Sequence, residues 1–277
     1  METFLQQAVQ ITPDRPAPAT FRCDNFWTGD APLCRTLADL YGSRPLDSFG
    51  GSYGWSVRYR QVEDYEKIGI STLSEYLTAF ESGNTPLPYL RHLSVNRAMP
   101  ALRGMLKLPQ AFKPNWANHP LLDRVSGPEL FIGQSGTSFG NLHQDQVCVH
   151  VGFVQLQGTK EFIVAPPEDA PLLDTFEGRE FPWQERNSRL RYSDLVDTDT
   201  GAIKSSPARI QRITLSAGEA LLLPANWWHT TLNLTDSISY SIRIVNGSNA
   251  LDSAAAYLSG IPKLFTKRRY QPVAQNI

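Results

Sequence analysis

The sequence predicts a mainly β protein, a sandwich or barrel preceded by an α/β extension and followed by one helix. From Leu130 onward, β-prone apolar runs alternate with Gly and turn residues. Strand follows strand there without an intervening helix, which is typical of an all-β core. The hydrophobic content of 41% and charged content of 19% describe a globular chain, and 277 residues are enough for a sizeable core. We therefore expect one domain over residues 1–277.

The extension, residues 1–125, mixes helical and strand patterns. An amphipathic segment and a Pro-rich arm come first, and a last short helix carries Leu102, Met105 and Leu106 on one face. Capping residues support a helix at 71–83, because Ser71 or Thr72 begins it and Gly83 ends it. Between arm and short helix we expect a helix in 27–42 ending at Gly42, a strand at 55–60, a helix at 71–83 and a strand at 89–95.

The core, residues 126–247, carries eight expected strands. They lie near 130–134, 141–146, 149–157, 159–165, 209–215, 219–223, 228–234 and 237–245. The polar segment 166–207 interrupts the series and is longer than a hairpin needs, so we expect a functional loop or a flexible excursion there. Residues 248–277 form a tail with one helix.

Charge and cysteine content exclude several classes of protein. The net charge of −1 gives no basis for nucleic-acid binding or attraction to a membrane, and the run at 267–269 is expected to be a solvated basic tail. Three cysteines argue against a disulfide framework, although a Cys23–Cys34 bridge stays open. No signal-like start or membrane-length apolar run is present, so we expect a cytoplasmic protein.

Three residues are candidate metal ligands. His143 and Asp145 are two apart in a β-prone context, so their side chains project to one face. His229 stands at the head of another expected strand, after Pro-x-x-Trp-Trp. Two imidazoles and one carboxylate suit non-haem Fe(II) and leave positions open for other ligands. Each residue alone could instead have a structural role, as a buried histidine or a turn carboxylate.

A lysine on the next strand is a candidate anion-binding residue. Alternation places Lys160 on the face of Phe162 and Val164, and a lysine aimed into a barrel needs an anionic partner such as a dicarboxylate. Arg243 competes for this role, but an arginine between isoleucines can equally point outside. The other histidines, His92, His119 and His150, are expected to be structural, and Cys148 to be a small buried residue.

Three segments resemble the JmjC-type, cupin-like 2-oxoglutarate oxygenases, in particular those related to the asparaginyl hydroxylase that inhibits hypoxia-inducible factor. They read IGQSGTSFGNLHQDQ, VQLQGTKEFIVAPPE and AGEALLLPANWWHTTLNL, within a similarity over about 85–245. The resemblance implies a double-stranded β-helix (jelly-roll) core, with Fe(II) on His143, Asp145 and His229. It also implies 2-oxoglutarate on Lys160 and Tyr89, with O₂ as the oxidant. Gly140 departs from the family, which often has a cosubstrate-binding Thr there.

The implied reaction is hydroxylation of an unactivated C–H coupled to conversion of 2-oxoglutarate to succinate and CO₂. We expect no catalytic residue beyond the metal ligands. A small-molecule or amino-acid-like substrate is favoured, with a protein or peptide side chain as the alternative and a cupin metalloenzyme or binding protein without 2-oxoglutarate as another. Trp228, Arg189 and Arg191 are candidate substrate contacts. The C-terminal helix offers a surface for a homodimer, as in some members of that family.

Overall fold

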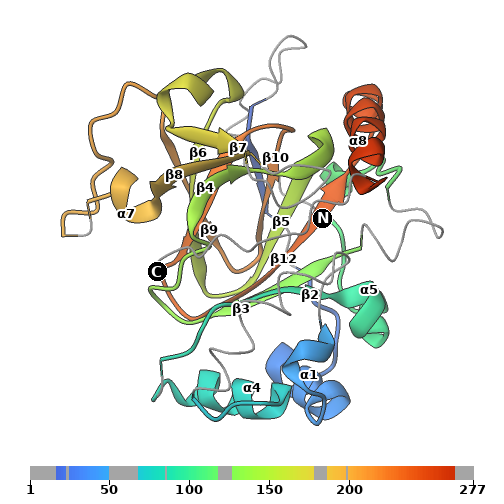
Figure 1. The fold of residues 1–277 in the computed structure, drawn as a ribbon. Helices are drawn as coiled ribbons and strands as arrows, with labels where there is room; N and C mark the ends of the chain where they lie inside the picture. Colours follow the sequence, from blue (N-terminus) through green and yellow to red (C-terminus); the bar gives the residue numbers. More distant parts are fainter. Residues whose placement is uncertain are drawn as a thin grey trace.

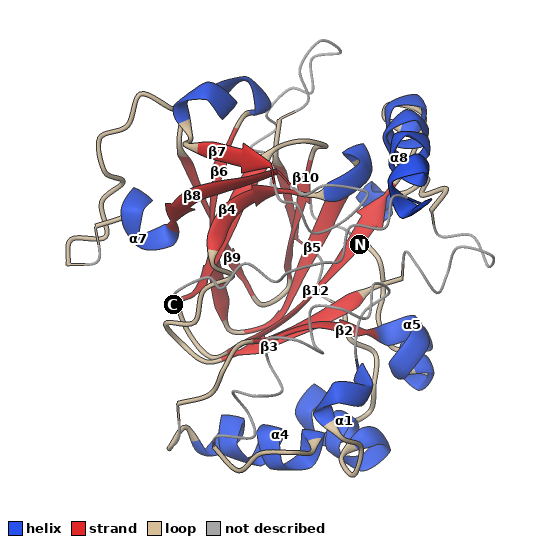
Figure 2. Cartoon of the chain, viewed as in Figure 1, coloured by secondary structure: helices blue, strands red, loops and turns tan. Residues whose placement is uncertain are grey.

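Two six-stranded antiparallel sheets face each other and form the body of the molecule (Figures 1 and 2). The structure is a computed structural model, and it describes residues 17–22, 25–49, 68–84, 86–117, 127–177, 186–197 and 199–265. The first sheet has the order β1-β10-β5-β12-β3-β2 and the second β7-β8-β4-β11-β6-β9. This is the expected double-stranded β-helix, in which every strand neighbour is antiparallel.

All eight strands predicted for the core are present. The strands are β1 (Ala19–Arg22), β2 (Leu90–Ser94), β3 (Glu129–Gly133), β4 (Asn141–Gln144), β5 (His150–Gln157), β6 (Thr159–Ala165), β7 (Thr175–Glu177), β8 (Arg186–Arg191), β9 (Gln211–Ser216), β10 (Glu219–Leu223), β11 (Trp228–Asn233) and β12 (Ser237–Ile244). The sequence also predicted β2, which lies in the extension, but it did not predict β1, β7 or β8. The strand expected at 55–60, His119 and the basic run 267–269 lie outside the described residues.

The segment 166–207 is more ordered than the loop that the sequence predicted. Within it, β8 pairs with β4 and β7 pairs with β8, so the segment adds two strands to the edge of the second sheet. The helix α7 (Tyr192–Leu195) follows, and Tyr192 and Leu195 pack on the outer face of this sheet beside Trp228. The sequence did not predict β8 because most of its side chains are polar and exposed or half-buried, although the strand is paired on both sides.

Two helices of the extension cover the outer face of the first sheet (Figure 1). They are α1 (Leu33–Tyr41) and α4 (Leu73–Ser82), and the short α5 (Val95–Ala98) follows β2. The capping box of α4 is confirmed, with Thr72 and Glu75 bonded reciprocally and Gly83 in the left-handed region. The first helix is shorter than predicted, because Pro32 precedes it and residues before a proline avoid helical geometry. A 3-10 helix, Pro100–Gly104, stands where the short helix was expected.

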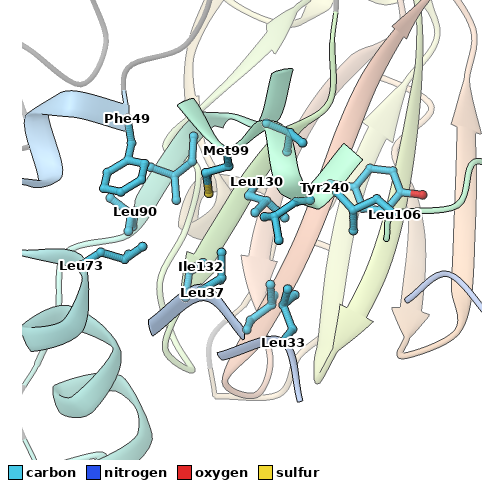
Figure 3. Packing of buried hydrophobic residues seen from close by; sticks show 14 of the residues in the cluster. Leu33, Leu37, Phe49, Leu73, Leu90, Met99, Leu106, Leu130, Ile132 and Tyr240 are labelled. Carbon is cyan, nitrogen blue, oxygen red and sulfur yellow. The ribbon is translucent and has the colours of Figure 1, made fainter. Parts of the chain in front are cut away.

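The largest hydrophobic cluster joins the extension to the core. Leucines of α1 and α4, among them Leu37 and Leu73, pack against Leu90, Leu130 and Ile132 of strands β2 and β3 (Figure 3). Each of these five side chains is buried. Because apolar burial contributes roughly 25 cal/mol per Å², this cluster fixes β2 and β3 in place. The division at residues 125 and 247 stays a prediction.

The C-terminal helix is confirmed as α8 (Ala250–Phe265), which contacts the turn at residues 146–148 after β4. Its Leu251 and Leu258 are exposed, and the homodimer through this helix stays a prediction. Cys34 is a free, buried thiol, whereas Cys23, the partner considered for it, lies outside the described residues. No helix among the described residues is long and apolar enough to span a membrane.

Two glycines with positive φ test how tightly the β5–β6 turn is packed. A Cβ at Gly158 (φ 71°) would meet the carbonyl oxygen of Asp236 at 2.1 Å, whereas a Cβ at Gly136 (φ 81°) would meet nothing within 4 Å. We expect Gly136→Ala to cost about 1–2 kcal/mol from backbone conformation alone, and Gly158→Ala to cost clearly more because of the clash. Urea unfolding of both variants measures the difference. Equal costs would contradict the close approach of Asp236.

Candidate metal centre

The two candidate metal histidines lie side by side on neighbouring strands. His143 on β4 is the register partner of His229 on β11, and their ring centroids are 4.3 Å apart. Both side chains are buried. Directly opposed residues of an antiparallel pair point to the same face of the sheet, so the pairing alone brings both imidazoles into the space between the sheets.

Asp145 joins them from just beyond the end of β4. Its backbone stays extended (φ −65°, ψ 153°), which preserves the alternation expected from the sequence and keeps the carboxylate on the face of His143. Its Oδ2 lies 3.5 Å from Nε2 of His229. One ligand atom from each of the three residues lies within 4.8 Å of the others, as the sequence predicted.

Backbone carbonyls orient both imidazoles. Nδ1 of His143 donates to the carbonyl of Asn141 at 3.1 Å, and Nδ1 of His229 donates to the carbonyl of Trp227 at 3.3 Å. A carbonyl only accepts, so the proton of each neutral ring sits on Nδ1 and the lone pair of Nε2 is directed away from the backbone. That is the tautomer a metal ion requires at Nε2.

The electrostatics of the triad fit a cation. Oδ2 of Asp145 is buried and has no hydrogen-bond partner in the part of the chain that the structure describes, and such a carboxylate oxygen is costly unless a positive charge compensates it. Burial, and next the neighbouring His143, lower the pKa of His229 to about 4. The ring is therefore neutral at physiological pH, as a metal ligand must be. Two neutral imidazoles and one carboxylate form a donor set suited to iron.

The three triad residues line a cavity between the sheets. Lys160 faces this cavity too, as alternation along β6 predicted. Its Nζ donates to the hydroxyl of Tyr89 at 2.9 Å and also to that of Ser239. Among the described residues no carboxylate lies within ion-pair distance of this ammonium. Burial lowers the pKa of Lys160 to about 7. Burial also raises the pKa of the Tyr89 phenol, so the phenol keeps its proton.

Two further residues differ from expectation by lining this cavity. Arg243 faces inward, where its Nη1 lies 3.7 Å from Oε1 of Glu129, so the outward orientation considered for it is wrong. His92 was expected to be structural, yet it lines the cavity and its Nδ1 lies 2.9 Å from Oε2 of Glu129. By contrast, His150 bonds to Ser248 and to the backbone of Ala225, consistent with a structural role. Neither Glu129 nor Ser239 was singled out from the sequence.

The three predicted substrate contacts do not line the cavity. Trp228 is fully buried on the opposite face of β11, because it alternates with His229, and packs in the outer cluster with Ile163. Arg189 is exposed, binds Asp174 at 2.6 Å and lies over the ring of Phe176. Arg191 is also exposed on β8. The cavity lining does not support the substrate-binding roles of these three residues, which stay predictions. Cys148 is half-buried rather than buried.

Aromatic rings form the remaining walls of the cavity. Phe139 stacks on His143 with centroids 4.6 Å apart, and Phe153 lies 5.7 Å from His229. Phe131 and Phe162 complete this lining. Apolar walls around a polar centre limit the access of water and strengthen every charge interaction inside.

Residues 21–243 match the family described as "Cupin-like domain". The chain belongs to the cupin-like family. Among its relatives is the human 2-oxoglutarate and iron-dependent oxygenase JMJD4, 27% identical over 186 residues, 65% of this chain and 42% of that protein. The Drosophila melanogaster homolog of JMJD4 is 25% identical over 162 residues, 58% of this chain and 35% of that protein. This cupin-like chain thus spans less than half the length of either relative.

A third relative has a different kind of name. HSPB1-associated protein 1 of Mus musculus is 32% identical over 114 residues, which is 41% of this cupin-like chain and 22% of that protein. Together, the similarity to JMJD4 and the triad identify the chain as a JmjC/cupin relative with a site compatible with iron.

The burial of the Lys160 ammonium predicts how the stability of the folded protein depends on pH. The pKa of Lys160 is about 7 in the folded protein and about 10.4 in an unfolded chain. Between these values the unfolded state binds more protons, so stability rises with pH, and below about pH 7 the penalty is fully present. We expect Lys160→Met to stabilise the ligand-free protein at pH 6. That advantage should shrink towards pH 9, by up to about 1.4 kcal/mol per pH unit.

Urea unfolding of the ligand-free protein at pH 6, 7, 8 and 9 measures this effect. Lys204→Met is the matched control, since Lys204 is exposed and its Nζ donates to the carbonyl of Ser193. A stability difference between wild type and Lys160→Met that stays constant from pH 6 to pH 9 would show that Lys160 is not desolvated.

Proposed function

We propose that the protein is an Fe(II)- and 2-oxoglutarate-dependent dioxygenase that hydroxylates an unactivated C–H of a small, amino-acid-like substrate and releases succinate and CO₂. One observation carries the proposal: a buried lysine without a carboxylate partner among the described residues shares a cavity with the His-Asp-His triad. A triad alone suits many cupin metalloenzymes. The lysine adds a demand for a second, anionic ligand beside the metal.

The metal would be held by His143, Asp145 and His229. A single carboxylate leaves part of a divalent charge uncompensated, and this residual charge favours an anionic, bidentate cosubstrate. When bound, iron supplies the activation of O₂ and 2-oxoglutarate supplies the electrons for substrate oxidation. The chain itself supplies the ligands, their orientation through the carbonyls of Asn141 and Trp227, and a dry setting.

The register of β6 supports a role for Lys160 at the far end of 2-oxoglutarate. Val164 is opposite His229 and Lys160 is opposite Asn233, four residues away. Four residues of strand span roughly 13 Å, which a lysine side chain and a five-carbon diacid can bridge together. We assign the distal carboxylate to the Lys160 ammonium, with the hydroxyls of Tyr89 and Ser239 positioning it. Pairing with this carboxylate would return the pKa of Lys160 towards its ordinary value.

The limited size of the cavity supports a small substrate. Its lining comes from facing strands of both sheets and from Phe131, Phe139 and Phe153, which leaves a confined space beside the triad. A protein or peptide side chain is the alternative, since relatives carry the names HSPB1-associated protein 1 and, from Arabidopsis thaliana, Lysine-specific demethylase JMJ21. Those names describe longer proteins, of which this chain covers 22% and 17%.

Metal binding tests the first part of the proposal. We expect the wild type to bind one equivalent of Fe(II) or Co(II) in anaerobic calorimetry. Asp145→Asn keeps the shape but removes the charge that compensates the metal, so it should weaken binding at least about tenfold. Asp174→Asn, which alters an exposed aspartate bound to Arg189, is the matched control and should bind as the wild type does. Equal binding by Asp145→Asn would remove Asp145 from the ligand set.

Cosubstrate kinetics test the second part. With Fe(II) and ascorbate, the wild type should form succinate from 2-oxoglutarate. Lys160→Met should raise the KM for 2-oxoglutarate by roughly 10- to 150-fold, the equivalent of a charge-assisted hydrogen bond of about 1.5–3 kcal/mol. Lys204→Met should leave this KM unchanged. A protein that binds metal but never forms succinate, or a Lys160→Met variant with an unchanged KM, would favour a cupin metalloenzyme without 2-oxoglutarate.

A further inference from the structure

A second polar cluster lies in the same cavity, on the sheet that faces the triad. It consists of His92 on β2, Glu129 on β3 and Arg243 on β12, which we call the Glu129 cluster. Glu129 is 3% exposed, and its oxygens lie 2.9 Å from Nδ1 of His92 and 3.7 Å from Nη1 of Arg243. The proposed metal and 2-oxoglutarate sites use none of these three side chains.

A β-bulge turns His92 into the cavity. The register between β2 and β3 shifts between Leu90 and Leu93, and both leucines pack in the core under the extension. His92 between them has φ 58°, in the left-handed region that non-glycine residues seldom adopt. Without the extra residue, strand alternation would not return both leucines to one face. The backbone thus accepts an unfavourable conformation that places an imidazole against the carboxylate of Glu129.

Strand register separates the Glu129 cluster from Lys160, because Glu129 is opposite Ser241 of β12 and Ser239 is the residue that bonds to Lys160. Along β12, Ser239, Ser241 and Arg243 all line the cavity. Ser239 bonds to Lys160, whereas Ser241 is paired with Phe153, whose ring contacts that of His229. Arg243 is one step further, opposite Val151. A cosubstrate that reaches from the metal to Lys160 therefore occupies the Ser239 side, and the Arg243 side is left for another molecule.

Charge balance indicates what that molecule carries. Glu129 is ionised at neutral pH, because Arg243 and His92 outweigh the effect of burial and hold its pKa at about 2. With Lys160 protonated beside a bound dicarboxylate, the cavity lining carries two carboxylates, Glu129 and Asp145, and two cations, Lys160 and Arg243. A divalent metal and a dicarboxylate would cancel each other. Because the charges in this cavity balance, a substrate is favoured when it has no net charge but presents one group of each sign to Arg243 and Glu129.

We propose that the Glu129 cluster binds the zwitterionic end of a free α-amino acid, with its carboxylate on Arg243 and its ammonium on Glu129. This deepens the proposed function and rests on it for the position of the oxidised carbon near the triad. Arg243 and Glu129 form an ion pair, with Nη1 and Oε1 3.7 Å apart, and an adjacent carboxylate and ammonium can extend this pair, with one group contacting each partner. His92 holds Glu129 in place, while Phe131 and Phe139 flank the imidazole.

Binding without turnover tests the proposal. The full chain is loaded with Zn(II), which has no redox chemistry, and 2-oxoglutarate, and each of the twenty common L-amino acids is titrated by calorimetry. We expect at least one to bind. Its amide, which lacks the carboxylate, and its N-acetyl derivative, which lacks the ammonium, should each bind at least about tenfold more weakly.

Two variants separate the roles of the two charges. Arg243→Met should abolish the preference for the acid over the amide, and Glu129→Gln should abolish the preference for the amine over the N-acetyl form. Neither should change the affinity for 2-oxoglutarate. Arg189→Met is the control, because Arg189 is exposed outside the cavity. Arg243→Lys keeps the charge but loses the planar fork, so it should retain an intermediate preference if Glu129→Gln proves unstable in a thermal melt.

Two results would overturn this proposal while leaving the proposed function intact. One is a loaded wild type that binds none of the twenty amino acids. The other is an Arg243→Met variant that loses affinity for 2-oxoglutarate as Lys160→Met does, because Arg243 would then serve the cosubstrate. If the wild type fails to bind 2-oxoglutarate, the proposed function fails. In that case the amino-acid titrations of the zinc-loaded protein still test the Glu129 cluster. Binding that requires Arg243 and Glu129 would support the proposal for this cluster, and the absence of binding would overturn it.

Discussion

The antiparallel pairing of β4 with β11 is the constraint on which the site depends. It sets His143 opposite His229, and the extended backbone through Asp145 brings the carboxylate to the same face. A slip of one residue in this register would turn one imidazole to the outer face, where Trp228 now packs. The packing of Trp228 therefore protects the metal centre although the residue does not touch it. Burial on the outer face and ligand geometry on the inner face are two consequences of one register.

Burial sets the charge state of the cavity lining in the absence of ligands. It lowers the pKa of Lys160 to about 7 and, with His143, that of His229 to about 4. Each group is thereby prepared for a different ligand: neutral His229 for a cation, and desolvated Lys160 for an anion that compensates its charge. Glu129 is the exception, because the positive charge of Arg243 and the bond to His92 keep it ionised in spite of burial. A site of this kind is stabilised by its ligands, and its polar groups are costly without them.

The sequence predicted the part of the site that follows from strand alternation, and missed the part that departs from it. His143 with Asp145, and Lys160 with Phe162, are spaced two apart, so their common face could be read directly. The eight core strands were likewise visible from turn residues and apolar runs. The strand β7 was missed because it has only three residues, β8 because most of its side chains are polar and exposed or half-buried, and β1 because four residues carry too little pattern. Arg243 could not be placed, since alternation shows that it opposes Ile242 and Ile244 but not which face is inside.

His92 could not be predicted for a more general reason, and this reason concerns the extension. Its position depends on a bulge that exists only because Leu90 and Leu93 are both drawn into the core formed with α1 and α4. The helices of the extension therefore determine which side chains of β2 enter the cavity, among them His92 and, just before the strand, Tyr89. Changes in that apolar contact could alter the wall that faces the triad without altering a metal ligand. Proteins that share this core but pack a different extension on β2 would thus keep the metal chemistry and differ in the molecule they admit.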